Sequence, residues 1–259
     1  MISIIIPAYN EEKRIGKTIE SYVNFFREEK QKKDIGNFEI LVVINGTDDN
    51  TENIVKRFAK KYKEIRWINF QEAGKGFAIT EGFKDTLKRK SQLIGFVDAD
   101  MSTPPEAFYS LVKNIKKYDG IIADRWDKKS TITPKQSFLR RFVSRGYNLI
   151  VRTLFLFPFR DTQCGAKLFR REILENNIKK LTTSNWGFDI ALLYCLRKES
   201  DARIKSIPTV WQDKTGSKIN LKETPIRMFA SCIRLRLIHS PFRDFVRMYR
   251  KLPDRFKFH

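Results

Sequence analysis

The stretch Leu93-Ile94-Gly95-Phe96-Val97-Asp98-Ala99-Asp100 joins an apolar run to two carboxylates. Residues 93–97 predict a buried strand, and Asp98 and Asp100 follow just past its end, where both side chains can face one site. Hard divalent cations such as Mg²⁺ or Mn²⁺ are held by one or two carboxylates together with substrate phosphates. The stretch therefore indicates a metal-bridged diphosphate, as in a nucleotide-activated donor, although Asp-X-Asp sequences also occur in ordinary loops.

Strand and helix patterns alternate around this stretch, which is typical of a mostly parallel sheet flanked by helices. Apolar runs predict strands at residues 2–6, 38–44, 66–68, 93–97, 119–123 and 203–211. Helical periodicity predicts helices at residues 11–29, 48–62 and 75–89, and Pro104-Pro105 begins a further helix. The sequence thus predicts one α/β domain over residues 1–220, followed by a basic amphipathic extension over residues 221–259.

The composition narrows the possible chemistry. The 259 residues include only two histidines, His239 and His259. We therefore expect neither a Ser-His-Asp hydrolase nor a His-ligated zinc site in the main body, and any base or metal ligand must come from carboxylates or from the substrate. The three cysteines match neither a zinc spacing nor a disulfide framework, which favours a reducing compartment.

Charge and hydropathy bear on the partners of the protein. The formal net charge is +21, and such a charge attracts nucleic acid, anionic lipid surfaces or phosphorylated substrates, although it also serves solubility. The chain has no helix-turn-helix, RNP or zinc-finger signature, so we predict no nucleic-acid partner. It has no run of 18 apolar residues, so we predict no transmembrane helix.

A series of short motifs is more specific than any one of them. In chain order they are Pro7 to Glu11, Gly74-Lys75-Gly76, Asp98-Ala99-Asp100, residues 161–169 (DTQCGAKLF), residues 186–189 (WGFD) and residues 216–218 (GSK). The series resembles the family 2 inverting glycosyltransferases of the Rossmann-like GT-A fold over roughly residues 1–220. Within that family the likeness is greatest to the polyprenyl-phosphate transferases, which include dolichyl-phosphate glucosyltransferase and dolichyl-phosphate mannose synthase.

The resemblance implies a donor site. Its nucleotide-binding residues would be Pro7, Tyr9, Glu11, Asn45, Asp49, Lys75 and Asp98. Two consecutive acids are usual in the family where Ile44 and Asn45 stand, so the contact with the nucleobase is altered and the identity of the nucleotide stays open. The alternatives are a plain strand-to-helix turn for Pro7 and Tyr9, and acids that complement or cap a helix for Glu11 and Asp49.

The resemblance also implies a metal site, catalytic residues and an acceptor site. Asp100 would bind Mg²⁺ or Mn²⁺ most directly, with Asp98 beside it, and Arg125 and Asp189 would complete the catalytic group. The acceptor phosphate would meet Arg125, Arg140, Gln163, Ser217 and Lys218, whose plain alternative is ordinary surface or loop residues. Cys164 is expected to be a packed small residue, and Ala191 replaces a glutamate that is usual in the family.

The implied reaction is an inverting transfer of a sugar from a UDP-glucose-like or GDP-mannose-like donor to dolichyl or another polyprenyl phosphate. It would take place at the cytoplasmic face of a membrane and feed glycan assembly. Residues 138–159 and 224–251 mix arginines with apolar side chains, which suits an anionic membrane interface, although such helices usually pack on their own domain. The alternatives are a soluble family 2 transferase with a hydroxyl acceptor and Asp161 or Asp189 as base, and a non-catalytic scaffold.

Overall fold

The computed structural model describes residues 1–134, 138–181, 187–212 and 223–238. In these ranges the chain forms a seven-stranded sheet in the order β3-β2-β1-β4-β7-β5-β8. Its strands are β1 (Ile2–Ala8), β2 (Phe38–Asn45), β3 (Ile65–Phe70), β4 (Leu93–Phe96), β5 (Gly120–Asp124), β7 (Lys167–Arg170) and β8 (Ile204–Pro208). Only β7 runs antiparallel to its neighbours, β4 and β5. The predicted α/β fold with a mostly parallel sheet is confirmed.

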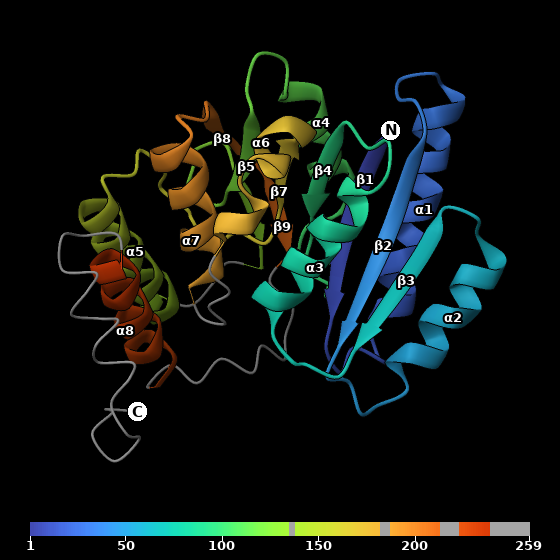
Figure 1. The fold of residues 1–259 in the computed structure, drawn as a ribbon, viewed down its shortest axis with the longest axis horizontal. Coiled ribbons are helices and arrows are strands. Elements are labelled where there is room, and N and C mark those ends of the chain that lie inside the picture. Colours follow the sequence, from blue (N-terminus) through green and yellow to red (C-terminus); the bar gives the residue numbers. More distant parts are fainter. Residues whose placement is uncertain (135–137, 182–186, 213–222, 239–259) are drawn as a thin grey trace.

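Helices cover both faces of this sheet (Figure 1). One core lies between the sheet and α1 (Ile15–Gln31), α2 (Thr51–Lys61) and α4 (Pro105–Asn114). The other core lies between the sheet and α3 (Lys75–Leu87), α5 (Phe138–Phe155), α7 (Phe188–Tyr194) and α8 (Glu223–Ile238). Successive side chains of a strand point to opposite faces, so Ile4 and Ile6 enter the first core and Ile5 enters the second.

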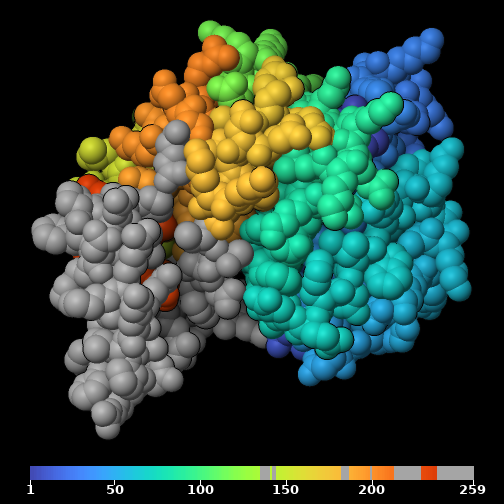
Figure 2. Space-filling model, in the orientation of Figure 1, coloured from blue at the N-terminus to red at the C-terminus, as the bar shows by residue number. Residues whose placement is uncertain are grey.

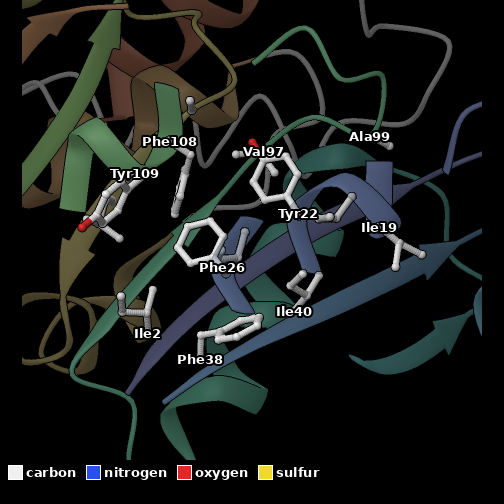
Figure 3. Close-up of a cluster of buried hydrophobic side chains, with 14 of the residues drawn as sticks. Ile2, Ile19, Tyr22, Phe26, Phe38, Ile40, Val97, Ala99, Phe108 and Tyr109 are labelled. Atoms are coloured by element: carbon white, nitrogen blue, oxygen red, sulfur yellow. The ribbon is translucent and has the colours of Figure 1, made fainter. Parts of the chain in front are cut away.

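Several aromatic side chains pack together among the aliphatic residues of the first core (Figure 3). Tyr22 and Phe26 lie one turn apart on α1 and their rings stack, with centroids 6.2 Å apart. Phe26 also contacts Phe38 of β2 and Phe108 of α4 edge-on or tilted. These four rings are buried, and burying each stabilises the fold by roughly 1.5–3 kcal/mol. They lock α1 and α4 onto the strands that deliver the functional loops.

The smaller elements complete the second face. α6 (Arg171–Glu175), a short 3₁₀ helix (Ile178–Lys180) and α3 lie side by side, and the space-filling view shows them as one continuous surface (Figure 2). A π-helical turn, η2 (Cys195–Glu199), continues α7. β6 (Thr131–Thr133) and β9 (Val210–Gln212) form a separate two-stranded ribbon.

Several element boundaries differ from the prediction. The helix expected at residues 11–29 begins at Ile15, because Asn10 has a left-handed backbone (φ 53°) and the following residues make a turn. The single strand expected at residues 203–211 is two strands, β8 and β9, interrupted at Thr209. β6 and β7 were not predicted, because three- and four-residue strands have too few residues to show an alternation.

Helices α5 and α8 pack against the domain rather than standing apart from it. Tyr147, Val151 and Phe155 of α5 and Cys232 and Leu235 of α8 are buried in the second core. The Tyr147 hydroxyl lies 3.2 Å from the Cys232 sulfur. The predicted division into a domain (residues 1–220) and a basic amphipathic extension (residues 221–259) stays a prediction. Within the described ranges, every helix is too short or too polar to cross a bilayer.

Candidate active site

The candidate site lies at the edge of the sheet where the parallel strands β1, β2 and β4 end (Figure 1). Open α/β sheets bind ligands at the carboxyl ends of their strands. The loop after β4 is anchored from below by α1: the Thr18 hydroxyl donates to the Ala99 carbonyl at 2.7 Å, and the Tyr22 hydroxyl donates to the Thr103 carbonyl at 2.8 Å. Met101, within this loop, has a left-handed backbone (φ 60°). This anchoring fixes the positions of Asp98 and Asp100.

Asp98 is paired within the protein. Its carboxylate forms an ion pair with Lys75, the first residue of α3. Burial alone would raise the pKa of Asp98, but the charge and hydrogen bond of Lys75, together with the charges of Lys167 and Arg125, outweigh burial and hold that pKa below its usual value. A Cβ atom on Gly165 would overlap the Asp98 carboxylate, so only glycine permits the backbone before β7 to pass this close. The site thus brings together three segments that the sequence series lists separately.

Asp100 has a different environment. Its Oδ1 accepts a hydrogen bond from the backbone N–H of Ser102 at 2.9 Å, and among the described residues no cationic side chain forms an ion pair with it. Its carboxylate is half-buried and adjoins the Lys75–Asp98 pair along the chain. Nowhere in the described part of the chain do three His, Cys, Asp or Glu side chains form a group that could hold a metal ion alone. A single available carboxylate beside a paired one fits Mg²⁺ or Mn²⁺ that completes its coordination with substrate phosphates.

On the donor side, the predicted residues are close together but already have protein partners. Glu11 is held by the guanidinium of Arg14 through two contacts of 2.7 Å, and burial raises the pKa of Glu11. Asp49 accepts hydrogen bonds from the backbone N–H groups of Glu12 at 3.0 Å and Thr51 at 2.9 Å. These contacts join the ends of β1 and β2 into one wall.

The other donor-side residues divide between buried and exposed. Asn45 is buried and bridges two segments: its Nδ2 donates to the Ala8 carbonyl at 3.0 Å, and its Oδ1 accepts from the Gly74 N–H at 2.9 Å. Ile44 is fully buried in the first core, and Pro7 is buried in β1. Tyr9 is 51% exposed, so its ring is available to a ligand. Contacts of all these residues with a nucleotide stay predictions.

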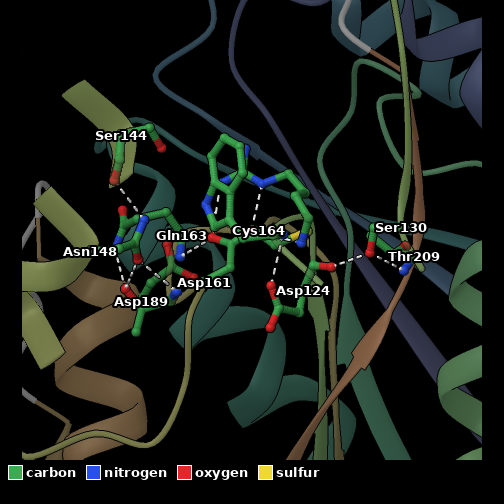
Figure 4. Close-up of polar contacts among 12 residues, drawn as sticks. Asp124, Ser130, Ser144, Asn148, Asp161, Gln163, Cys164, Asp189 and Thr209 are labelled. Atoms are coloured by element: carbon green, nitrogen blue, oxygen red, sulfur yellow. Dashed lines mark hydrogen bonds and ion pairs between the residues drawn. The ribbon is translucent and has the colours of Figure 1, made fainter. Parts of the chain in front are cut away.

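Arg125 and the fully buried Asp161 form a bidentate ion pair. Figure 4 shows Asp161 among the polar contacts of this region, with Gln163 and Asn148 near it. Arg125 Nε donates to Asp161 Oδ2 at 2.6 Å, and a terminal guanidinium nitrogen donates to Oδ1 at 3.0 Å. Arg125 holds the pKa of Asp161 below its usual value against the opposing effect of burial. Asp161 also accepts from the Gln163 backbone N–H at 3.1 Å, and Asn148 of α5 accepts from the Thr162 N–H at 3.1 Å. The loop that precedes Gly165 is thereby fixed from two sides.

Lys167 binds one of the predicted site residues, and the sequence prediction assigned it no role. It lies at the start of β7, is completely buried, and pairs in the sheet with Phe96 of β4. Its ammonium group donates to Asp189 at 2.5 Å and to the Cys164 carbonyl at 2.7 Å. A lysine at the start of an apolar strand was the available signal, because buried lysines need a partner.

The surroundings of Lys167 bear on two predictions: that Cys164 is a packed residue, and that Asp161 or Asp189 is the base for a hydroxyl acceptor. Cys164 is fully buried, which confirms the prediction of a packed residue, and burial raises the pKa of its thiol to about 11. Asp189 and Asp161, the two candidate bases for a hydroxyl acceptor, are both ion-paired, with Lys167 and Arg125 respectively. Their carboxylates therefore act as counterions in this structure.

The remaining predicted residues cannot be placed. Ser217, Lys218 and Trp186 lie outside the described residues. The backbone of Arg140 belongs to α5, and its side chain is likewise outside the description. Their roles at the acceptor phosphate, like those of Arg125 and Gln163, stay predictions.

Comparison with known proteins finds relatives over most of the chain. The chain is 31% identical over 245 residues to a dolichyl-phosphate beta-glucosyltransferase of Dictyostelium discoideum, covering 91% of this chain and 73% of the relative. It is 28% identical over 258 residues to the dolichyl-phosphate beta-glucosyltransferase of Saccharomyces cerevisiae, covering 92% of this chain and 75% of the relative.

A solved structure with the same fold is glucosyl-3-phosphoglycerate synthase from Mycobacterium tuberculosis in complex with Mn²⁺, UDP and phosphoglyceric acid. It superposes with a TM-score of 0.66 at 18% identity, over 92% of this chain and 77% of that chain. At this identity the likeness concerns the fold alone. The family described as glycosyl transferase family 2 matches residues 3–178. With its GT-A sheet and its Asp98–Asp100 loop in place, the chain belongs to glycosyl transferase family 2.

Proposed function

We propose that the protein transfers a glucosyl group from a nucleotide-activated, UDP-glucose-like donor to dolichyl phosphate or another polyprenyl phosphate, with inversion at the anomeric carbon. The product would feed glycan assembly. The proposal is supported by relatives named dolichyl-phosphate beta-glucosyltransferase, which match over most of this chain. A GDP-mannose-like donor is the alternative to be tested, because Ile44 replaces an acid expected at the nucleobase.

The observation that carries the proposal is the pairing of both candidate bases. A sugar hydroxyl must lose its proton during transfer, and this needs a carboxylate with a free lone pair near the acceptor. Asp161 and Asp189 are instead bound to Arg125 and Lys167 at 2.6 Å and 2.5 Å. A phosphate monoester has a second pKa near ~6 and is already an oxyanion at pH 7. An acceptor of this kind needs no base, so the pairing favours it over a hydroxyl.

The predicted site residues would have separate roles in binding the metal, the donor and the acceptor phosphate. Asp100 would hold Mg²⁺ or Mn²⁺, which when bound offsets charge on the diphosphate leaving group. The paired Asp98 and Lys75 lie beside it, where Asp98 can accept hydrogen bonds from sugar or ribose hydroxyls. Arg125, oriented by Asp161, would add positive charge near the acceptor phosphate, with Arg140, Gln163, Ser217 and Lys218 as further predicted contacts.

An acceptor that lies in a bilayer also implies that the protein acts at a membrane surface. We propose that the protein acts peripherally at the cytoplasmic face of a membrane with anionic lipids. Support comes from the net charge of +21 and from α5 and α8, in which arginines alternate with apolar residues. Basic residues near an anionic surface each contribute on the order of 1 kcal/mol to binding.

The proposal is tested by one transfer assay with two acceptors and a panel of donors. The purified protein is incubated with UDP-glucose, UDP-galactose, UDP-N-acetylglucosamine or GDP-mannose, in Mg²⁺ or Mn²⁺, and with a polyprenyl phosphate or an alkyl glycoside. We expect sugar on the polyprenyl phosphate, with UDP-glucose the best donor. Transfer to the alkyl glycoside instead would favour the soluble, hydroxyl-directed transferase. Neither transfer nor donor hydrolysis under any condition would favour the scaffold.

A further inference from the structure

A hollow of about 400 Å³ opens at the carboxyl end of α5. Its lining comes from α5, from the residues that follow it, and from the π-helical turn η2. The lining includes Leu149, Arg152, Thr153, Leu156, Phe157 and Arg197. π-helical turns within longer helices are frequent at functional positions, and η2 is the turn that carries Arg197.

The described lining of the hollow is positively charged. Two arginines line it, and none of its described lining residues is acidic. The Arg152 Nε is buried and has no hydrogen-bond acceptor in the described part of the chain, which is costly for a donor of any kind. The Arg197 guanidinium lies over the Phe159 ring, 5.7 Å from its centre. Guanidinium groups bind phosphate through paired hydrogen bonds, so the two arginines give the hollow the positive charge and the hydrogen-bond donors that a phosphate group binds.

The rim of the hollow is apolar and faces outward. Leu149 is 62% exposed and Leu156 is 71% exposed. Ile150, the neighbour of Leu149, is 44% exposed. The opposite side of α5 already packs into the core through Tyr147, Val151 and Phe155, so core packing does not explain the outward leucines. Apolar side chains beside arginines on one helix are typical of segments that lie in a membrane interface.

We infer that this hollow binds the phosphate headgroup of an anionic phospholipid while Leu149 and Leu156 enter the acyl region of the bilayer. The inference rests on the proposed function only in placing the protein at a membrane. The described lining of the hollow shares no residue with the predicted acceptor site, and Arg197 follows Asp189 by eight residues along α7 and η2. Eight helical residues span roughly 12 Å, so the same helical segment reaches from the catalytic edge to the docking site.

The test is binding to liposomes without any nucleotide sugar. The intact protein is floated with vesicles of phosphatidylglycerol and phosphatidylcholine, or of phosphatidylcholine alone, at low salt. The double variant Arg152→Gln/Arg197→Gln should lower the partition coefficient on anionic vesicles at least roughly tenfold. The matched control Lys113→Gln/Lys117→Gln removes the same charge from exposed positions around the end of α4 and should bind nearly as the unmodified protein.

Further variants separate the site from the alternatives. Leu149→Ser keeps every charge and should also weaken binding severalfold, because it removes apolar insertion. Equal binding by the arginine pair and the lysine control would overturn the proposal. So would release by inorganic phosphate beyond that by chloride at the same ionic strength, which would assign the hollow to free phosphate. A change of oligomeric state in Leu149→Ser would assign the face to a second copy and overturn it as well.

Failure of docking and failure of the proposed function give different results. Transfer to a short-chain, water-soluble polyprenyl phosphate does not need a bilayer, so the arginine double variant should retain it within about twofold. Circular dichroism and thermal unfolding confirm that each variant is folded. Selective liposome binding without any transfer would support the docking site and reject the transferase function. Transfer without selective liposome binding would support the transferase function and reject the docking site.

Discussion

Lys167 and Asp189 join β7 to the first turn of α7 through an ion pair of 2.5 Å in which the lysine is completely buried. The same ammonium group binds the Cys164 carbonyl, next to Gly165, whose backbone contacts Asp98. Phe188, beside Asp189, packs against Gly76, and the neighbour of Gly76 is Lys75, which pairs with Asp98. The contacts form a closed ring that includes Asp98, so Asp189 has a structural role in addition to any catalytic role.

Breaking this pair from either side should have unequal effects on stability. Asp189→Asn leaves the Lys167 charge buried without a counterion, and we expect a loss of about 3–5 kcal/mol in the free energy of unfolding. Lys167→Met leaves Asp189, whose side chain is 12% exposed, so water can solvate part of the charge and the loss should be smaller. Urea unfolding of both variants measures the difference. Equal losses would show that the burial of the lysine does not decide the cost.

Replacing Asp100 should affect transfer much more than stability. Asp100→Asn removes the negative charge that would hold the metal, and we expect kcat/KM to fall roughly a hundredfold or more. The stability should change by less than about 0.5 kcal/mol, as for most surface positions. EDTA should inactivate the unmodified protein, and added Mn²⁺ or Mg²⁺ should restore it.

The control for Asp100 is Asp48→Asn, an exposed acid in the loop after β2. It changes the charge of the protein by the same amount and should leave transfer within about threefold of normal. Full activity of Asp100→Asn, or of the unmodified protein in EDTA, would reject the metal assignment.

The close contact between Gly165 and Asp98 predicts that even a methyl group is not tolerated. In Gly165→Ala the new Cβ would overlap the Asp98 carboxylate, so the loop or the Lys75–Asp98 pair must shift. A displacement of about 1 Å at a catalytic group can cost on the order of a hundredfold in rate. Gly36→Ala is the matched control, because a Cβ there meets no atom within 4 Å. Equal kcat/KM values for the two variants would contradict the prediction.

The Arg125–Asp161 pair should make stability depend on pH. The folded-state pKa of Asp161 is lowered, and its unfolded value is about 3.9. The contribution of the pair is therefore complete above about pH 4 and is lost as the pH falls through the folded-state pKa. In Arg125→Gln, burial acts on Asp161 without an opposing cation, so its pKa should rise and acidification should favour the folded form.

The comparison of these two proteins is the measurement. The difference in the free energy of unfolding between the unmodified protein and Arg125→Gln should be about 3–5 kcal/mol at pH 7 and should shrink towards pH 3. Urea titrations at pH 7, 5 and 3.5 give it directly. A difference that stays constant with pH would mean that Asp161 is not ionised in the fold.

Much of the fold could be predicted because its signals are local. Runs such as residues 2–6 and 38–44 are buried on both faces of the sheet and are apolar except for Ser3 and Glu39, which is the pattern of central parallel strands. β7 escaped prediction because it has four residues, begins with a lysine and runs antiparallel between β4 and β5. Nothing local in those residues specifies the direction of the strand.

The sequence by itself determined the order of β1 to β5 along the chain, the Asp98–Asp100 loop at the end of β4, and the absence of histidine from the described site. Each of these depends on residues that are neighbours in the chain. Only the tertiary structure decided which charges meet: Lys75 with Asp98, Arg125 with Asp161, and Lys167 with Asp189. These partners lie 22 to 36 positions apart. A buried charge must find a counterion in space, and the folding of the sheet, rather than the spacing of residues, sets which one it finds.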